Sequence, residues 1–163
     1  VAETARLVGE RGGRAGSRVV DVGDEAAVAQ LVEATIAEFG GLDVMFANAG
    51  ITGPLRPLDE LTAEDFMKVL RVNLVGVFLC VKYAARYMRA HGGGSIVCTA
   101  SVAALRSGAG PIQYSASKAG VVSLVQNEAM DLAGSGVRVN AVWPGLIEIG
   151  MTKPLFDGAR ATS

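Results

Sequence analysis

The sequence is poor in the residues from which metal centres and disulfide frameworks are built. Its 163 residues include a single histidine, His91, and two cysteines, Cys80 and Cys98. The spacing of these three residues fits none of the familiar zinc-ligand patterns. Cys80 falls in a helical pattern and Cys98 in an apolar strand pattern, so both are expected to be reduced and buried, while His91 suits the end of a helix before three glycines. The sequence therefore predicts neither a metal site nor a disulfide.

The chain also lacks a strong excess of charge and a long apolar run. Fifteen Lys and Arg face sixteen Asp and Glu, which gives a formal net charge of −1 and no basic surface of the kind that nucleic acid requires. The longest apolar stretch, near residues 74–81, is far shorter than the ~20 residues that cross a bilayer, and no signal-peptide pattern opens the sequence. Half of the residues are hydrophobic, which suffices for a core. We expect one cytoplasmic domain over residues 1–163, without nucleic-acid or membrane partners.

Helical and strand patterns alternate along the chain. This alternation predicts the α/β class with a doubly wound, Rossmann-like parallel sheet. Asp24 is expected to cap one helix, and Thr62 with Asp65 resembles a capping box at the start of another. The run over 42–46 is almost continuously apolar, as in a strand covered on both faces. Helices are expected near residues 1–10, 25–39, 62–90 and 114–132, and strands near 18–22, 42–46, 95–100 and 137–142.

Polar residues follow the predicted strands. The loops after the four strands begin at Asp21, Asn48, Ser101 and Pro144. Open α/β sheets bind ligands beyond the carboxyl ends of their strands. We therefore expect these four loops to share one edge of the sheet and to form the ligand site.

Tyr114 and Lys118 form the most informative pair. They lie one helical turn apart, so their Cβ atoms are expected within about 5–6 Å of each other. An ammonium group so close favours the phenolate, which would suit Tyr114 to proton transfer near neutral pH. Taken alone, the pair fits an amphipathic helix surface better. Ser101, which ends a strand thirteen positions before Tyr114, adds a hydroxyl donor at the same edge and favours a catalytic site.

These residues stand in a longer ordered pattern. It comprises Asn48-Ala49-Gly50, Asn73, Ser101, Tyr114-Ser115-Ala116-Ser117-Lys118 and Pro144-Gly145. In this order and spacing the sequence resembles the short-chain dehydrogenase/reductase family, and the resemblance runs from Asp21 through Pro144. It implies an NAD(P)-dependent enzyme that interconverts a secondary alcohol and a ketone.

The resemblance implies a role for each catalytic residue. Tyr114 would exchange a proton with the substrate oxygen, and Lys118 would hold the nicotinamide ribose and favour ionisation of the tyrosine. Ser101 would donate a hydrogen bond to the substrate oxygen. Asn73 would anchor a water chain from Lys118, although a polar residue accommodating a bend in a long helix is the simpler interpretation of its position.

Cofactor contacts are implied along the same edge of the sheet. Asp21 and Val22 would contact adenine, although an Asp that ends a strand and caps a turn fits Asp21 equally well. The remaining contacts would come from Asn48, Ala49 and Gly50 at the adenosine ribose, from Tyr114 and Lys118, and from Pro144, Gly145 and Ile147 beside the nicotinamide.

Departures from the family pattern concern the cofactor. Gly23 stands where the family usually has Ser or Thr, and Ala47 stands where it usually has Asn. Ile149 stands where the family commonly has a Thr whose hydroxyl meets the carboxamide. The family's glycine-rich phosphate loop, two strands between those ending at Asp21 and Phe46, and the final strand have no counterpart in the sequence. We therefore expect the natural protein to be longer. The residue that sets the preference for NAD or NADP in the family lies in the missing part, so the sequence does not distinguish the two cofactors.

Two further expectations concern the substrate and the assembly. Val102, Gln113 and Ile149 are candidates for lining the substrate pocket. The helices expected at 62–90 and 114–132 carry more apolar residues than one stripe requires, which predicts a homodimer or homotetramer. The alternative function is that of a cofactor-incompetent structural or oligomer-forming module.

Overall fold

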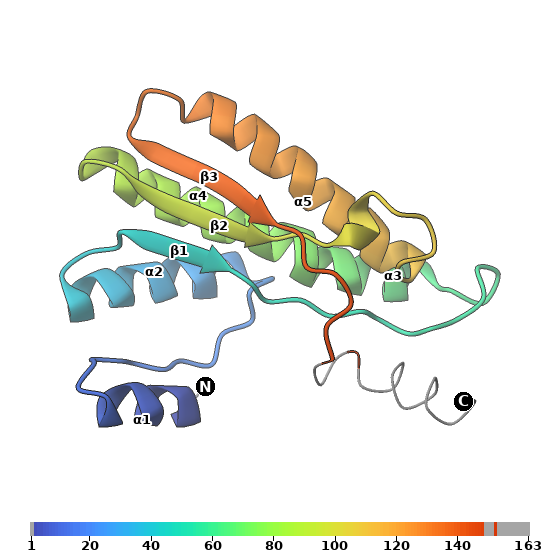
Figure 1. Ribbon diagram of the computed structural model, residues 1–163, viewed down its shortest axis with the longest axis horizontal. Coiled ribbons are helices and arrows are strands. Elements are labelled where there is room, and N and C mark those ends of the chain that lie inside the picture. The colour runs from blue at the N-terminus through green and yellow to red at the C-terminus, as the bar shows by residue number, and fades with distance from the viewer. Residues whose placement is uncertain (1, 149–151, 153–163) are drawn as a thin grey trace.

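The computed structural model describes residues 2–148 and residue 152. Three parallel strands form one sheet in the order β1-β2-β3, and the helices precede and connect them (Figure 1). Sequence reasoning predicted this α/β, Rossmann-like arrangement correctly. The elements are α1 (Ala2–Glu10), α2 (Glu25–Phe39), β1 (Val44–Ala47), α3 (Ala63–Leu70), the π-helical turn η1 (Arg71–Val75), α4 (Gly76–Ala90), β2 (Gly94–Thr99), the 3-10 turn η2 (Val102–Ala104), α5 (Ile112–Asp131) and β3 (Val137–Val142).

The strands bury the side chains of one face against α4 and α5. In register, Met45 of β1 pairs with Ile96 of β2, which pairs with Val139 of β3. Ile96 is completely buried and belongs to a cluster with residues of both helices. Residues of the opposite face are open, and Val44 and Phe46 remain 62% and 57% exposed. The expectation that the strand over 42–46, here β1, is covered on both faces is therefore wrong for the described chain. The helices that contact the sheet lie on one side of it (Figure 1).

The helix starts follow local chemistry. The Asp24 side chain accepts a hydrogen bond from the Ala27 amide at 3.1 Å and caps α2 as predicted. Thr62 and Asp65 form the predicted capping box at the start of α3. Both predictions held because each cap depends on residues at most three positions apart.

The long helical region is not uniform. A π-helical turn, η1, separates α3 from α4 within the long helical region that was predicted over 62–90. Such a turn accommodates one extra residue per turn and re-aims the side chains around it. It carries Arg71 at one end and the fully buried Asn73 at its centre.

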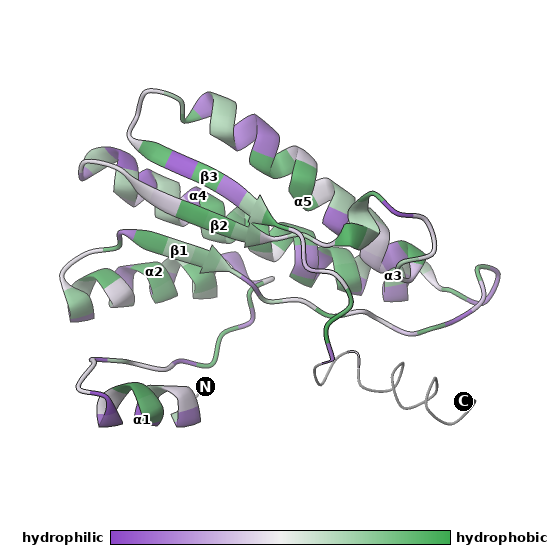
Figure 2. Cartoon of the chain, viewed as in Figure 1, coloured by the Kyte–Doolittle hydropathy of each residue, from purple (hydrophilic) through white to green (hydrophobic). Residues whose placement is uncertain are grey.

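Residues 18–22 do not form a strand, and that prediction is wrong. Val19 is fully exposed, and the segment has no regular secondary structure and is tethered through Arg14 and Arg18 to Glu38 of α2. A strand needs a hydrogen-bonding neighbour, and within residues 2–148 none lies beside this segment. Hydropathic colouring shows β1 and β2 mainly as hydrophobic, whereas β3 alternates hydrophobic and hydrophilic residues (Figure 2).

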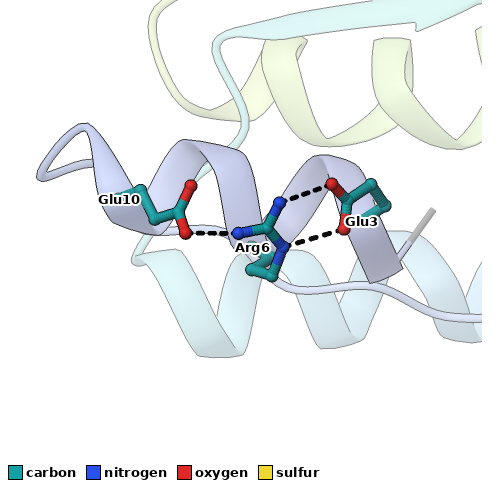
Figure 3. A network of polar contacts seen from close by, with 3 residues as sticks. All are labelled: Glu3, Arg6 and Glu10. Atoms are coloured by element: carbon teal, nitrogen blue, oxygen red, sulfur yellow. Dashed lines mark hydrogen bonds and ion pairs between the residues drawn. The ribbon is translucent and has the colours of Figure 1, made fainter.

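Helix α1 lies apart from the sheet and contains no buried residue (Figure 1). Its polar contacts are local: Arg6 pairs with Glu3 and Glu10 along the helix surface (Figure 3).

Candidate active site

A cleft of about 900 Å³ opens beyond the carboxyl ends of β2 and β3. The side of the cleft formed by η2 and the following loop is apolar, with Val102 and Leu105, and the loop after β3 contributes Trp143 and Leu146. Ser101 and Tyr114 both line this cleft. The full lining comprises Thr52, Ser101, Val102, Leu105, Arg106, Ser107, Gly108, Ala109, Gly110, Pro111, Tyr114, Trp143, Gly145, Leu146 and Thr152.

Ser101 is fixed by the end of the sheet. It follows β2 and caps η2, where its Oγ accepts a hydrogen bond from the Ala103 amide at 3.2 Å. The Val102 amide donates to the Pro144 carbonyl at 3.2 Å, which joins the loops after β2 and β3. Only 8% of Ser101 is exposed. Its hydroxyl therefore sits in a rigid, nearly buried setting at the cleft.

Tyr114 and Lys118 lie on the first turns of α5, as predicted from their spacing. The Lys118 ammonium nitrogen lies 5.6 Å from the centre of the Tyr114 ring and donates a hydrogen bond to the Thr99 carbonyl at 2.7 Å. Lys118 is 2% exposed, and burial lowers its pKa from the ordinary lysine value. The structure thus places a buried cation beside the tyrosine that lines the cleft.

Asn73 links three segments from its position in η1. Its Oδ1 accepts a hydrogen bond from the Ile51 amide at 2.8 Å, and its Nδ2 donates to the Ile51 carbonyl at 2.9 Å and to Ser117 Oγ at 3.0 Å. Ser117 in turn donates to the Tyr114 carbonyl at 2.7 Å. Sequence reasoning gave Ser117 no role, although it stands inside the Tyr-Ser-Ala-Ser-Lys motif. The π-turn agrees with the expected irregularity of the helix at Asn73, and the hydrogen bonds tie it to the helix of Tyr114.

The loop after β1 approaches the same residues. A Cβ on Gly50 would lie 3.4 Å from Asn73 Oδ1 and 3.5 Å from Lys118 Nζ, so the Gly50 backbone runs beside both. Asn48 Oδ1 accepts a hydrogen bond from Thr99 Oγ1 at 2.8 Å, while Asn48 and Ala49 are exposed. The predicted adenosine-side loop and the predicted ribose-binding lysine therefore meet.

Asp21 and Val22 form a turn that packs on η1 and α4. Asp21 Oδ1 accepts a hydrogen bond from the Gly23 amide at 2.8 Å, and a Cβ on Gly76 would lie 2.8 Å from Val22 Cγ2. Val22 thus fits closely against the first residue of α4. The turn is held in place although the strand expected before it does not form.

The loop after β3 contributes Gly145 to the cleft. Pro144 is fixed through its carbonyl, as described for Ser101. Ile147 is 55% exposed, and its carbonyl accepts a hydrogen bond from the Thr152 hydroxyl. Ile149 lies outside the described residues.

Gln113 is not a pocket residue, contrary to the sequence expectation. It is 1% exposed, and its side-chain amide donates to the carbonyls of Thr52 at 3.3 Å and Pro54 at 2.8 Å. Its role is to brace the loop after β1, whereas Val102 does line the cleft. The sequence around Gln113 could not indicate this bracing role, because the partner carbonyls lie about sixty residues earlier in the chain.

Among residues 2–148 and residue 152, no three His, Cys, Asp or Glu side chains gather where they could hold a metal ion. No helix in this part of the chain has the length and apolar character needed to cross a bilayer. Cys80 and Cys98 are free thiols, and burial raises the pKa of Cys98 to about 11.

Known proteins are similar to the chain in both sequence and fold. The chain is 43% identical over 160 residues to cis-4-hydroxycyclohexanecarboxylate dehydrogenase of Sinomonas cyclohexanicum, covering 98% of the chain and 64% of that protein. It is similar to the crystal structure of levodione reductase, with a TM-score of 0.90 and 37% identity over 98% of the chain and 62% of that structure. The structure of NAD+-bound xylitol dehydrogenase matches with a TM-score of 0.90 and 34% identity, covering 99% and 63%.

The chain spans less than two thirds of the length of each of these proteins. The family model for short chain dehydrogenases matches residues 1–160, nearly the whole sequence. The order of the motif residues along the chain, the three-stranded parallel sheet and these similarities all indicate the same family. The chain belongs to the short chain dehydrogenase family.

Proposed function

We propose that the protein is an NAD(P)-dependent oxidoreductase that interconverts a secondary alcohol and a ketone. The observation that carries the proposal is the joint placement of Ser101 and Tyr114 at one cleft, with the Lys118 ammonium 5.6 Å from the tyrosine ring. A hydroxyl donor, a phenol and a buried cation together provide what a carbonyl or alcohol oxygen needs for proton transfer.

The residues present fit the nicotinamide side of the cofactor. Within the described chain, no heavy atom beyond its own chain neighbours lies within 4 Å of where a Cβ on Gly145 would stand, so a ligand can approach that backbone. The residues that would hold the cofactor are Asp21, Val22, Asn48, Ala49, Gly50, Tyr114, Lys118, Pro144, Gly145 and Ile147. When bound, a nicotinamide cofactor supplies or accepts the hydride, and NAD and NADP are equally compatible with these residues.

The chain's own residues account for the proton and the developing charge. For reduction, the Tyr114 hydroxyl gives its proton to the substrate oxygen, and for oxidation the phenolate takes it back. Lys118 stabilises that phenolate by its positive charge, and Ser101 donates a hydrogen bond to the same substrate oxygen. Asn73 holds the loop at Ile51 and the helix of Tyr114 in register, and it would anchor water that reconnects Lys118 with solvent.

The cleft favours a medium-sized, largely apolar alcohol or ketone. Its volume of about 900 Å³ lies at the upper end of ordinary ligand pockets. Two relatives are named for cyclic substrates, a hydroxycyclohexanecarboxylate and levodione. A cyclic ketone or its alcohol is therefore the first substrate class to assay.

A second candidate is a module that has the fold but does not bind cofactor. It concerns these 163 residues by themselves, which contain no glycine-rich turn of the kind that holds the pyrophosphate. NADH titration followed by nicotinamide fluorescence discriminates the two. The titration is made on this chain and on the chain extended at its N-terminus by the corresponding segment of the Sinomonas relative, here called the extended chain.

We expect the extended chain to bind NADH and to reduce a cyclic ketone. Failure of the extended chain to bind either NADH or NADPH would contradict the enzyme proposal. Tight binding by the 163-residue chain itself would instead show that the pyrophosphate loop is dispensable.

The assembly proposed here is a homodimer or homotetramer through α4 and α5. Val75 and Phe78, at the start of the α4 region, stay 41% and 43% exposed, and Met130 of α5 is 76% exposed. Apolar side chains on paired helices are typical of such interfaces. Sedimentation of the extended chain as a monomer at micromolar concentration would contradict this.

A further inference from the structure

The turn at residues 21–23 is held from two sides by the region that carries Asn73. On one side, Val22 packs against Gly76 at the start of α4. On the other, Arg71 of η1 reaches the turn: its Nε donates to the Gly23 carbonyl at 3.3 Å, and its terminal nitrogen lies 3.8 Å from Asp21 Oδ2. The other carboxylate oxygen of Asp21 accepts from the Gly23 amide. One oxygen of this exposed carboxylate therefore has a hydrogen-bond partner, and the other faces the Arg71 guanidinium as an ion pair.

Glycine at position 23 is what lets Arg71 lie there. A Cβ on Gly23 would stand 2.7 Å from Cγ and from Nε of Arg71, closer than real Cβ contacts come. The backbone of Gly23 lies outside the left-handed region, so the chain itself would accept alanine at this position. Gly23 and Arg71 thus form a coupled pair, and sequence reasoning recognised Gly23 only as a departure from the family pattern.

We propose that Arg71 is a positioning residue of the adenine side of the cofactor site, which acts by lying across Gly23 and orienting the Asp21 carboxylate. This inference rests on the proposed function, since Asp21 matters in this way only where a nucleotide binds. Arg71 itself needs no contact with the ligand. It reduces the freedom of an exposed carboxylate before binding, and preorganisation of this kind raises affinity without a new contact.

The position of Arg71 gives the inference a second consequence. Only Val72 separates it from Asn73, so one π-helical turn orients the adenine side through Arg71 and the loop beside Lys118 through Asn73. A change at Arg71 should therefore weaken nucleotide binding while leaving the proton-transfer residues in place.

AMP tests the proposal on the 163-residue chain, because AMP probes the adenine side without the missing pyrophosphate turn. Binding is followed by amide NMR shifts of residues 21–23, in the parent chain, Arg71→Ala, Gly23→Ala and the double variant. Each single change should weaken AMP binding about three- to tenfold, and the double variant should be no weaker than Arg71→Ala alone. Arg71→Lys should recover part of the affinity.

Arg56→Ala is the matched control, because Arg56 forms an ion pair of similar length, 3.5 Å, with Asp65 away from this turn. The inference is overturned if AMP does not shift the amides of residues 21–23. It is equally overturned if Arg71→Ala changes AMP affinity no more than Arg56→Ala does, or if the two single effects add in the double variant.

NADH titration of the extended chain separates this result from the proposed function. We expect the dissociation constant for NADH to rise in Arg71→Ala with kcat unchanged. If Arg71→Ala binds NADH as tightly as the parent extended chain does, the role of Arg71 is refuted and the proposed function is unaffected. If neither NADH nor NADPH binds the parent extended chain, the proposed function fails, while AMP shifts would still report on the turn.

Discussion

Two regions of this chain differ sharply in how their polar groups are held. From β2 to β3, the site residues are buried and partnered: Lys118 and Ser101 are at most 8% exposed, and each makes a specified hydrogen bond. From residue 2 to residue 23, α1 buries nothing and the chain that follows is irregular and mostly exposed. The comparison teaches that the geometry of the candidate site depends on the sheet and α5, whereas the first region is held by surface contacts.

The largest expected effect concerns the chemistry of the buried region. Tyr114→Phe should lower turnover by about a hundredfold to ten-thousandfold in the extended chain, because it removes the proton donor alone. NADH affinity should stay within about twofold. Ketone-dependent NADH oxidation and NADH fluorescence measure the two quantities.

Tyr87→Phe is the control for that change. Tyr87 stacks on His91 near the end of α4, and it does not line the cleft. Turnover of Tyr114→Phe within tenfold of the parent would show that another group moves the proton.

The next effect concerns the stability of the buried region. Asn73→Ala removes the partners of the Ile51 amide and carbonyl and of Ser117, where Asn73 and Ser117 are fully buried and Ile51 is partly buried. Each unsatisfied buried group costs about 1–3 kcal/mol, so the free energy of unfolding should fall by roughly 2–4 kcal/mol. Urea denaturation of the 163-residue chain measures it. A loss below about 1 kcal/mol would mean that water replaces the amide without penalty and that Asn73 is no structural link.

These contacts also show what the sequence could reveal. Caps at Asp24 and Thr62 and the strand over Val137–Val142 were predictable, because each depends on residues close in sequence or on the period of one segment. The absence of a strand over 18–22 was not predictable, since strand formation depends on a neighbouring strand rather than on the segment itself. Apolar spacing alone cannot reveal a π-helical turn such as η1.

The candidate site shows the same division. The spacing of Tyr114 and Lys118 predicted their common helix face, and Ser101 was placed correctly at a strand end. Gln113 was misassigned and Arg71 was missed, because their partners lie 61 and 48 residues away in the chain. Local pattern carries no information about such pairs.

A smaller effect concerns the charge of Lys118. Burial lowers its folded-state pKa below the unfolded value of ~10.4. Between the two values the unfolded chain holds a proton that the folded chain has lost, so stability rises with pH in this window and levels off above it. The difference in unfolding free energy between the parent and Lys118→Met should therefore rise as pH approaches ~10.4.

Lys68→Met is the control for the loss of one lysine side chain, because Lys68 is exposed on α3. A difference for Lys118→Met that falls with rising pH would mean that a partner, rather than burial, governs the ammonium.

The smallest effect should come from the exposed first region, and it tests the comparison directly. Arg6 pairs with Glu3 and Glu10 on α1, and all three side chains are more than half exposed (Figure 3). Exposed pairs of this kind are screened by solvent and contribute little to global stability. Arg6→Ala should therefore leave the urea midpoint of the 163-residue chain unchanged, while the amides of α1 exchange faster with deuterium because the helix frays. A shift of the midpoint as large as that of Asn73→Ala would show that α1 is docked on the cooperative core, and the division between the two regions would then be wrong.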